Sequence, residues 1–307
     1  MELMIVGIIL LLFSLEPFFI PDSLKTALFL TLFYASFCFG IILVSDAICQ
    51  KVTGRSTVRA LLAPGRGRWR FFILAVVAGF AFDGAASYFG ALWFYPFYST
   101  LFYLIAIVAL GGFIGYWLTI VISYDAAKEV LDEVVGEKDV TRDFRFEKTV
   151  YKIFLVLGIA GTAISLHKIG LNTNFLQNFT FNVTTFKPPY LEFSYVLLLT
   201  FSLLFVFEFV EYYRHRTSLI KDVIHGYWNP LVAIVLISVV LGIYMEGQNL
   251  PIRLWVYVNW PWQEVKIFGL PILVLVVWPL QYVLFLSFYR AFGDRRSEEL
   301  WTPTKLK

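Results

Sequence analysis

The sequence is poor in charged, thiol and imidazole side chains. Asp, Glu, Lys and Arg make up 15% of its 307 residues, and it has only 2 cysteines and 3 histidines. Cys38 and Cys49 fall in or beside one apolar segment, and their spacing provides neither a disulfide framework nor a cysteine-based metal site. The chain also lacks a glycine-rich phosphate loop, a His-Glu-x-x-His motif and a nucleophile elbow. We therefore expect no bound metal and no cofactor.

Apolar residues are abundant instead, at 59% of the chain, and 19% of all residues are aromatic. A soluble domain with this balance could not cover its surface, whereas a transmembrane helix needs roughly 20 consecutive apolar residues. The first apolar run has no basic region before it and no small-residue cleavage site, which indicates a retained helix. We predict an all-α integral membrane protein with about eight transmembrane helices. They lie near residues 3–20, 24–46, 70–90, 98–123, 149–167, 191–212, 230–247 and 267–289.

Basic side chains gather beside three of these spans. The three clusters are Lys51, Arg55, Arg59, Arg66, Arg68 and Arg70; Arg214, Arg216 and Lys221; and Arg290, Arg295 and Arg296. The positive-inside rule places all three in the cytoplasm, so we predict a multi-pass protein of the cell membrane with both termini cytoplasmic. Topology accounts for the basic residues, and no nucleic-acid partner is predicted. Asn178 and Asn182 lie in sequons of an outer loop where glycosylation could occur, although such triplets often arise by chance.

One unusual motif occurs twice. Residues 79–96 read GFAFDGAASYFGALWFYP, and residues 242–261 read GIYMEGQNLPIRLWVYVNWP. Each has a glycine four residues before an acid, a glycine directly after it, and Leu-Trp-x-Tyr seven or eight residues after that second glycine. Asp83 matches Glu246 163 residues later, and Arg55-Ser56-Thr57 matches Arg216-Thr217-Ser218 161 residues later. A nearly constant offset predicts duplication of a four-span unit, with two parallel copies around a pseudo-twofold axis along the membrane normal.

The duplication predicts the domain organisation. Between the two copies lies a charged segment in which apolar residues recur at helical spacing from 127 to 134. Such a pattern is typical of a helix that lies along the membrane surface. We predict a first four-helix repeat at 1–124, a charged cytoplasmic linker with an amphipathic helix at 125–148, a second four-helix repeat at 149–293 and a cytoplasmic tail at 294–307.

The two matched acids, Asp83 and Glu246, are candidate catalytic residues. Asp83 lies roughly 20 Å along its helix from the cytoplasm, in the outer third of the hydrocarbon, and Glu246 falls at a similar depth. An ionised carboxylate there costs at least several kcal/mol unless it is paired, hydrated or protonated. Gly79 and Gly242 share a helix face with the acids, and small residues mark close helix contacts. Both acids are therefore predicted to face the interior of the bundle.

Two interpretations of this site stay open. In the first, desolvation favours the neutral acid, which delivers a proton to a carbon–carbon double bond while nearby rings stabilise the resulting cation. The candidate substrate-binding residues are Trp93, Tyr95, Asn249, Trp255, Tyr257 and Trp260. In the second, the acids only fix helix packing, and the rings form the aromatic belt that membrane proteins carry at their interfaces.

A second polar group is predicted at the cytoplasmic ends of spans two and six. Asp46 matches Glu208 at an offset of 162 residues, and Glu211 and His215 follow Glu208 on the same helix face. Such a group could ligate a metal. We favour solvated interfacial charges that balance the neighbouring arginines.

The repeat unit resembles the lycopene cyclase domain of microbial carotenoid enzymes and the related membrane hydratases that act on bacterioruberin precursors. The likeness rests on Asp83 with Gly90-Ala-Leu-Trp93-Phe-Tyr95, on Glu246-Gly247 with Leu254-Trp255-Val-Tyr257, and on Gly269-Leu-Pro271 with Trp278. The cyclases typically carry a proline followed by paired glutamates in the next span, where this chain continues from Pro271 with Ile-Leu-Val-Leu. That departure puts cyclisation by the cyclase mechanism in doubt.

Three functions are compatible with these features. The resemblance implies a membrane enzyme that acts on an isoprenoid or carotenoid-like lipid at a double bond, as a cyclase, hydratase or isomerase. Its partner is then a membrane lipid or hydrophobic polyene substrate. The alternatives are a non-catalytic subunit of a membrane protein complex, with a membrane protein as partner, and a transporter of small solutes or lipids.

Overall fold

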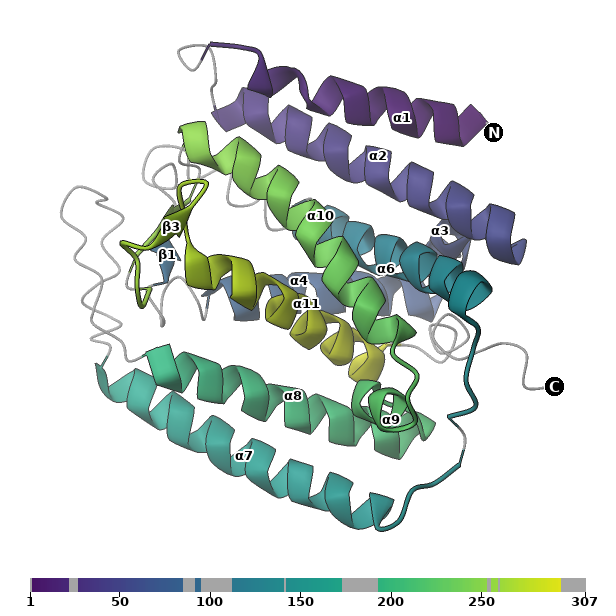
Figure 1. Cartoon of the computed structure of the whole chain (residues 1–307), viewed down its shortest axis with the longest axis vertical. Helices are drawn as coiled ribbons and strands as arrows, with labels where there is room; N and C mark the ends of the chain where they lie inside the picture. Colours follow the sequence, from purple (N-terminus) through teal and green to yellow (C-terminus); the bar gives the residue numbers. More distant parts are fainter. Residues whose placement is uncertain are drawn as a thin grey trace.

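The structure is a computed structural model, and it describes residues 2–21, 27–84, 92–94, 112–140, 142–172, 193–252, 255–258 and 260–293. Long helices account for most of this part of the chain (Figure 1). They are α1 (Glu2–Ser14), α2 (Ala27–Thr53), α4 (Arg66–Gly84), α6 (Phe113–Val135), α7 (Glu147–Asn172), α8 (Phe193–His215), α10 (Asn229–Ile252) and α11 (Ile272–Phe292). The predicted all-α class is confirmed.

Several short elements connect the long helices. A 3-10 turn, η1 (Glu16–Phe18), follows α1, and the short helices α3 (Thr57–Leu62) and α9 (Leu219–Ile224) follow α2 and α8. Strands β1 (Trp93–Phe94) and β2 (Val256–Tyr257) pair with each other, as do β3 (Lys266–Ile267) and β4 (Leu270–Pro271). We call the end of the bundle that carries α3 and α9 the α9 end, and the opposite end the β1 end (Figure 1).

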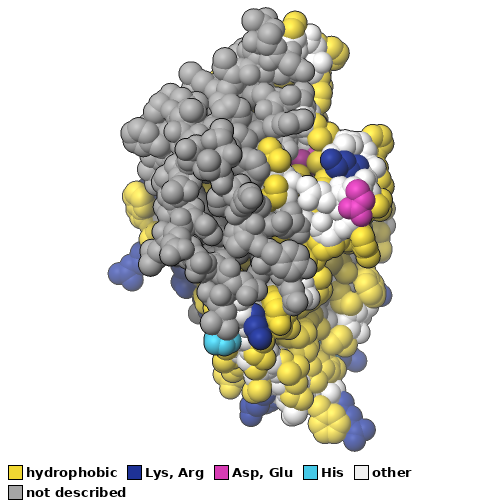
Figure 2. Space-filling view, turned by 90° about the vertical axis from the view of Figure 1, so that its left-hand side faces the viewer, with side chains coloured by type: hydrophobic (Ala, Val, Ile, Leu, Met, Phe, Trp, Pro, Cys, Tyr) yellow, Lys and Arg dark blue, Asp and Glu magenta, His cyan; other side chains and the backbone are white. Residues whose placement is uncertain are grey.

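Five helices of the described residues are long and apolar enough to cross a membrane. They are Thr31–Thr53, Glu147–Ile169, Phe193–His215, Asn229–Leu250 and Ile272–Phe292. Viewed from the β1 end, hydrophobic side chains prevail among the described residues and charged ones are scattered (Figure 2). These observations support a membrane protein.

Two helix boundaries differ from the predicted spans. The first span was predicted at 3–20, but α1 ends at Ser14 and the chain turns through η1. Pro17 explains this end, because proline has no N–H with which to continue the helical hydrogen bonds. The fourth span was predicted to end at 123, whereas α6 continues to Val135.

The continuation of α6 buries its charged face. Asp125 and Lys128 are each 1% exposed, while the apolar Val134 is exposed. Residues 125–135 are therefore not a separate amphipathic helix on the membrane surface, as the apolar spacing predicted. Ion pairs and hydrogen bonds, described below, hold the polar face inside the protein.

The long helices form a stack whose two edges are hairpins (Figure 1). At one edge α1 packs on α2, which packs on α6, and at the other edge α7 packs on α8, which packs on α11. Helices α4 and α10 fill the centre, where α4 contacts α6 and α11, and α10 contacts the same two helices. Each contact among the first four long helices thus has a counterpart among the last four. The main core lies among α2, α4, α6, α8, α10 and α11.

Glycines set the close approach within both hairpins. A Cβ on Gly40 of α2 would lie 3.0 Å from the carbonyl oxygen of Gly7 on α1. A Cβ on Gly158 of α7 would lie 2.8 Å from the carbonyl oxygen of Ser202 on α8. Small residues at helix crossings allow backbones to meet where lipid provides no hydrophobic driving force between helices.

Candidate functional site

The two copies of the acid–aromatic motif meet at the β1 end. Strand β1 pairs antiparallel with β2, so that Trp93 lies opposite Tyr257 and Phe94 lies opposite Val256. Leu92 extends the contact, because its carbonyl oxygen accepts hydrogen bonds from the Val258 amide at 2.9 Å and the Trp260 indole at 2.8 Å. Segments that are far apart in sequence thus form one small sheet.

Glu246, in the penultimate turn of α10, is 2% exposed and hydrogen-bonded. The Tyr257 hydroxyl donates to one carboxylate oxygen, and the Asn249 amide donates to the other at 3.3 Å. The Asn249 side-chain oxygen accepts from the backbone N–H of Trp255 at 2.9 Å, and the Trp255 indole donates to the Tyr257 hydroxyl at 3.1 Å. Four of the residues predicted for this site therefore form one network around the acid.

Asp83, in the last turn of α4, is half-buried. The Trp93 indole N–H donates to one of its carboxylate oxygens at 3.1 Å. The Trp93 ring in turn meets the Tyr257 ring edge to face, with centroids 6.4 Å apart. A chain of side chains, Asp83–Trp93–Tyr257–Glu246, therefore connects the two acids across the strand pair.

The glycine four residues before each acid lies against an aromatic ring. Gly79 packs on the Phe113 ring at the start of α6, and Gly242 lies 3.6 Å, measured from an ideal Cβ, from the Trp278 ring of α11. The Trp278 side chain also hydrogen-bonds with Glu246. The prediction that these glycines mark close helix contacts is confirmed.

Further aromatic residues surround Glu246 that the sequence did not single out. Tyr34 of α2 donates to the Met245 carbonyl oxygen at 3.0 Å, and its ring lies 6.3 Å from the Trp255 ring. Tyr116 of α6 and Tyr282 of α11 share a hydrogen bond of 2.6 Å between their hydroxyls. The Tyr282 ring contacts Trp278 at 6.0 Å. Their apolar flanking sequence gives no signal of this role, because only helix packing brings them together.

The remaining predicted residues divide as follows. Trp260 is buried beneath the strand pair, where its ring meets Tyr257 edge to face with centroids 5.7 Å apart. Tyr95 lies outside the described residues, as do the sequons at Asn178 and Asn182. The aromatic and acidic groups thus form a polar cluster with π faces, which is the environment that protonation of a double bond requires.

Asp46 and Glu208 cap the two short helices at the α9 end. Ser56 and the Val58 amide donate to Asp46 at 2.8 and 2.9 Å, and the Ile220 amide donates to Glu208 at 2.9 Å. Carboxylates at helix N-termini satisfy free N–H groups and stabilise the helix. Both acids are buried, so the prediction of solvated interfacial charges is wrong. The sequence could not reveal this, because the capped helices fold back onto the acids.

Glu211 is also buried, at 1% exposure, and pairs with Arg290 of α11 at 2.6 Å. Arg290 also reaches Asp222 of α9 at 3.5 Å. Burial raises the pKa of Asp222 to about 6, and the Arg290 charge opposes this rise. Among the described residues no three His, Cys, Asp or Glu side chains converge as metal ligands would.

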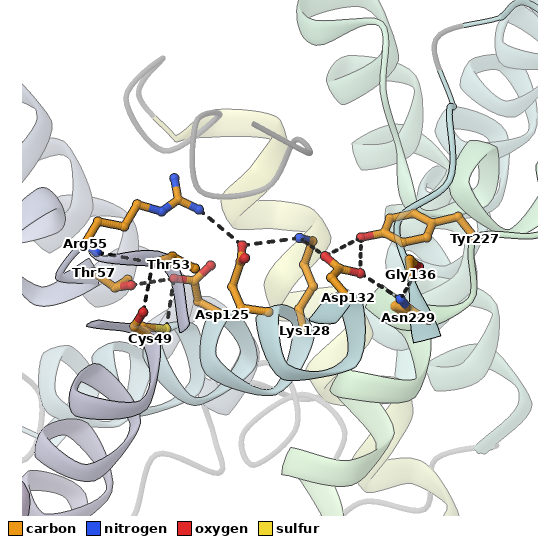
Figure 3. Close-up of polar contacts among 11 residues, drawn as sticks. Cys49, Thr53, Arg55, Thr57, Asp125, Lys128, Asp132, Gly136, Tyr227 and Asn229 are labelled. Carbon is orange, nitrogen blue, oxygen red and sulfur yellow. Dashed lines mark hydrogen bonds and ion pairs between the residues drawn. The ribbon is translucent and has the colours of Figure 1, made fainter. Parts of the chain in front are cut away.

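The buried face of α6 connects the two halves of the protein (Figure 3). Asp125 accepts hydrogen bonds from Thr57 and, at 3.5 Å, from the Cys49 thiol. Lys128 pairs with Asp132 at 2.7 Å, and Asp132 accepts from Tyr227 at 2.7 Å. Burial raises the pKa of Asp125 to about 6. This network joins α2 and α3 to the start of α10.

The same local geometry recurs 162 residues apart at the α9 end. Ser56 and Ser218 are the N-caps of α3 and α9, and each accepts from the backbone N–H three residues later. Gly54 and Arg216 both adopt a left-handed backbone, with φ of 76° and 62°. The predicted match of Arg55-Ser56-Thr57 with Arg216-Thr217-Ser218, at 161, is therefore wrong by one residue. Residue types alone aligned these segments, whereas the caps and backbone align them at 162.

Comparison with protein-family models, with curated proteins and with solved structures finds no match for this chain.

Proposed function

We propose that the protein is an integral membrane enzyme that acts by acid–base chemistry on a double bond of an isoprenoid or carotenoid-like lipid. The observation that carries the proposal is the Asp83–Trp93–Tyr257–Glu246 chain, in which two carboxyls at helix ends share one aromatic network. The apolar helices around it support a substrate that is itself apolar.

The proposal includes a duplicated architecture of about eight spans, with Asp83 and Glu246 in equivalent positions. The matching helix contacts of the two halves, and the caps that recur at an offset of 162, support it. The strand pair adds a further argument. At that offset Phe94 corresponds to Val256, and these two residues are paired with each other, as expected where a twofold axis passes between equivalent strands.

The chemistry needs one acid and one base. Glu246 is the more deeply buried carboxyl and the better candidate for the protonated acid. Its proton adds to one alkene carbon, the π electrons form the new C–H bond, and the other carbon becomes cationic. Asp83 then removes a proton from a neighbouring carbon, which yields an isomer, or from a water that adds to the cation, which yields an alcohol. Rings at this site stabilise the cation by about 2 kcal/mol each when water is excluded.

The test compares Glu246→Gln and Asp83→Asn in cells that supply polyene lipids, with chromatography of the extracted lipids and fluorescence-detected size exclusion of the protein. Each amide keeps an oxygen that can accept the hydrogen bond from Tyr257 or Trp93, so both variants should fold while conversion is lost. Glu16→Gln, an exposed carboxyl in η1, is the matched control and should convert normally. Unchanged products in both folded variants would remove catalysis from these acids.

A second candidate is a non-catalytic subunit of a membrane complex. It is favoured by the hydrogen bonds on Glu246, because both carboxylate oxygens already have protein partners and fix β2 against α10. In that case both variants leave lipid products unchanged but lower the unfolding temperature, and the native protein copurifies with stoichiometric partners.

A further inference from the structure

The glycine after Glu246 makes room for a residue from the other end of the chain. A Cβ on Gly247 would lie 3.0 Å from Cζ and 3.1 Å from Cε1 of Phe18. The edge of the Phe18 ring therefore rests on the bare backbone of α10, beside the acid. Any larger residue at 247 would displace the ring, which gives this glycine of the repeated motif a role.

One main-chain carbonyl holds the end of α1 against α10. Tyr244 and Gln248 both donate to the Ser14 carbonyl oxygen, at 2.7 and 3.2 Å. Residues 244, 247 and 248 share one helix face, so the two donors lie on the same side of α10 as Gly247. The Phe18 ring also contacts the Tyr244 ring edge to face, at 6.3 Å.

The other side of Phe18 is open. Its side chain is 46% exposed, and the neighbouring Phe19 is 85% exposed. Further apolar residues of α1, such as Leu12, are also exposed. In a membrane protein such a surface faces lipid. Phe18 therefore separates the Glu246 site from the bilayer, and it can rotate about its own side-chain bonds without breaking the hydrogen bonds to Ser14.

We propose that Phe18 is a movable wall through which the Glu246 site opens sideways to the bilayer, so that its ligand is an apolar chain that enters from lipid between η1 and α10. The identity of the ligand rests on the proposed function. The lateral opening does not, because it is a property of Phe18, Gly247 and the surrounding lipid.

The test uses dicyclohexylcarbodiimide, an apolar reagent that reacts from the lipid phase with protonated carboxyls. The carboxyl proton moves to one carbodiimide nitrogen while the carboxylate oxygen bonds to the central carbon. The acyl group then migrates from that oxygen to nitrogen and leaves a stable N-acylurea. The full chain in proteoliposomes is treated for increasing times, and peptide mass spectrometry measures the modified fraction of Glu246. A water-soluble charged carbodiimide is used in parallel.

We expect the apolar reagent, and not the charged one, to modify Glu246. Phe18→Ala should accelerate the modification at least several-fold, and Phe18→Leu should do so to a smaller extent. Phe19→Ala is the matched control, because this side chain is more exposed, and it should react at the wild-type rate. Phe18→Leu also keeps the test decisive if the alanine variant fails to fold.

Equal rates in the wild type, Phe18→Leu and Phe18→Ala would overturn the proposal, as would faster modification by the charged reagent. Absence of modification in every variant would overturn it too, since no lateral opening would then admit an apolar reagent. The readout needs no turnover. If Phe18 controls labelling but Glu246→Gln still yields normal lipid products, the entrance stands and the enzymatic proposal fails.

Discussion

Arg290 provides the most direct test of how the buried charges stabilise this protein. Its guanidinium is almost fully buried and lies 2.6 Å from Glu211 and 3.5 Å from Asp222. Removal of one partner from a buried ion pair costs about 3–5 kcal/mol, because the remaining charge keeps its desolvation penalty. Folded domains are stable by only about 5–15 kcal/mol. We expect Arg290→Met to lower the unfolding temperature by about 6–10 °C, at about 2 °C per kcal/mol for a chain of this size.

The loss should depend on pH. Burial already raises the pKa of Asp222 to about 6, above its value of about 3.9 in an unfolded chain. The folded state therefore binds this proton more tightly, and the stability it contributes falls as the pH rises from about 4 to about 6. Without Arg290 the pKa of Asp222 rises further and the fall extends to higher pH. The deficit of Arg290→Met should thus be larger at pH 8 than at pH 5.

The assay is thermal unfolding of the detergent-solubilised protein, followed by the fluorescence of its 9 tryptophans. Arg59→Met, at an exposed arginine, is the control and should unfold like the wild type. Glu211→Gln combined with Arg290→Met should recover part of the loss, because it removes one of the unpaired charges. An unfolding temperature of Arg290→Met within about 2 °C of the wild type at pH 8 would refute the argument, since it corresponds to only about 1 kcal/mol.

Three further predictions concern the helix network. Asp125→Asn should remove a fall of about 3 kcal/mol in unfolding free energy between pH 4 and 7, because burial raises the Asp125 pKa by about 2 units to about 6; equal pH slopes in thermal unfolding of wild type and variant would contradict this. Gly158→Ala should destabilise more than Gly161→Ala, by about 1–3 kcal/mol, because the new methyl at 158 meets the Ser202 backbone while that at 161 meets a hydroxyl that can rotate; the reverse order in denaturant unfolding would count against the hairpin packing. Ser56→Ala should cost about 1 kcal/mol as a lost cap, and Ser218→Ala should cost more, because Ser218 also hydrogen-bonds to Tyr151 at 2.5 Å; equal losses would refute that difference.

Several features followed from the sequence alone. The apolar runs required helices in a membrane, because no other backbone form satisfies its hydrogen bonds within a single crossing segment. The repeated acid–aromatic motif also identified Glu246, Asn249, Trp255 and Tyr257 as one group, and the structure brings all four together. The short distance along the chain between these residues limited where their side chains could lie.

Only the tertiary structure decided which charges are buried and what touches the acid. Asp46, Glu208 and Glu211 read as interfacial charges, because burial of a carboxylate depends on partners such as Val58, Ile220 and Arg290 that folding supplies. The polar face of α6 was hidden for the same reason. The contact of Phe18 with Gly247 spans most of the chain, and local sequence patterns carry no information on pairs so far apart. Helices are determined by neighbouring residues, whereas sites between helices are determined by packing.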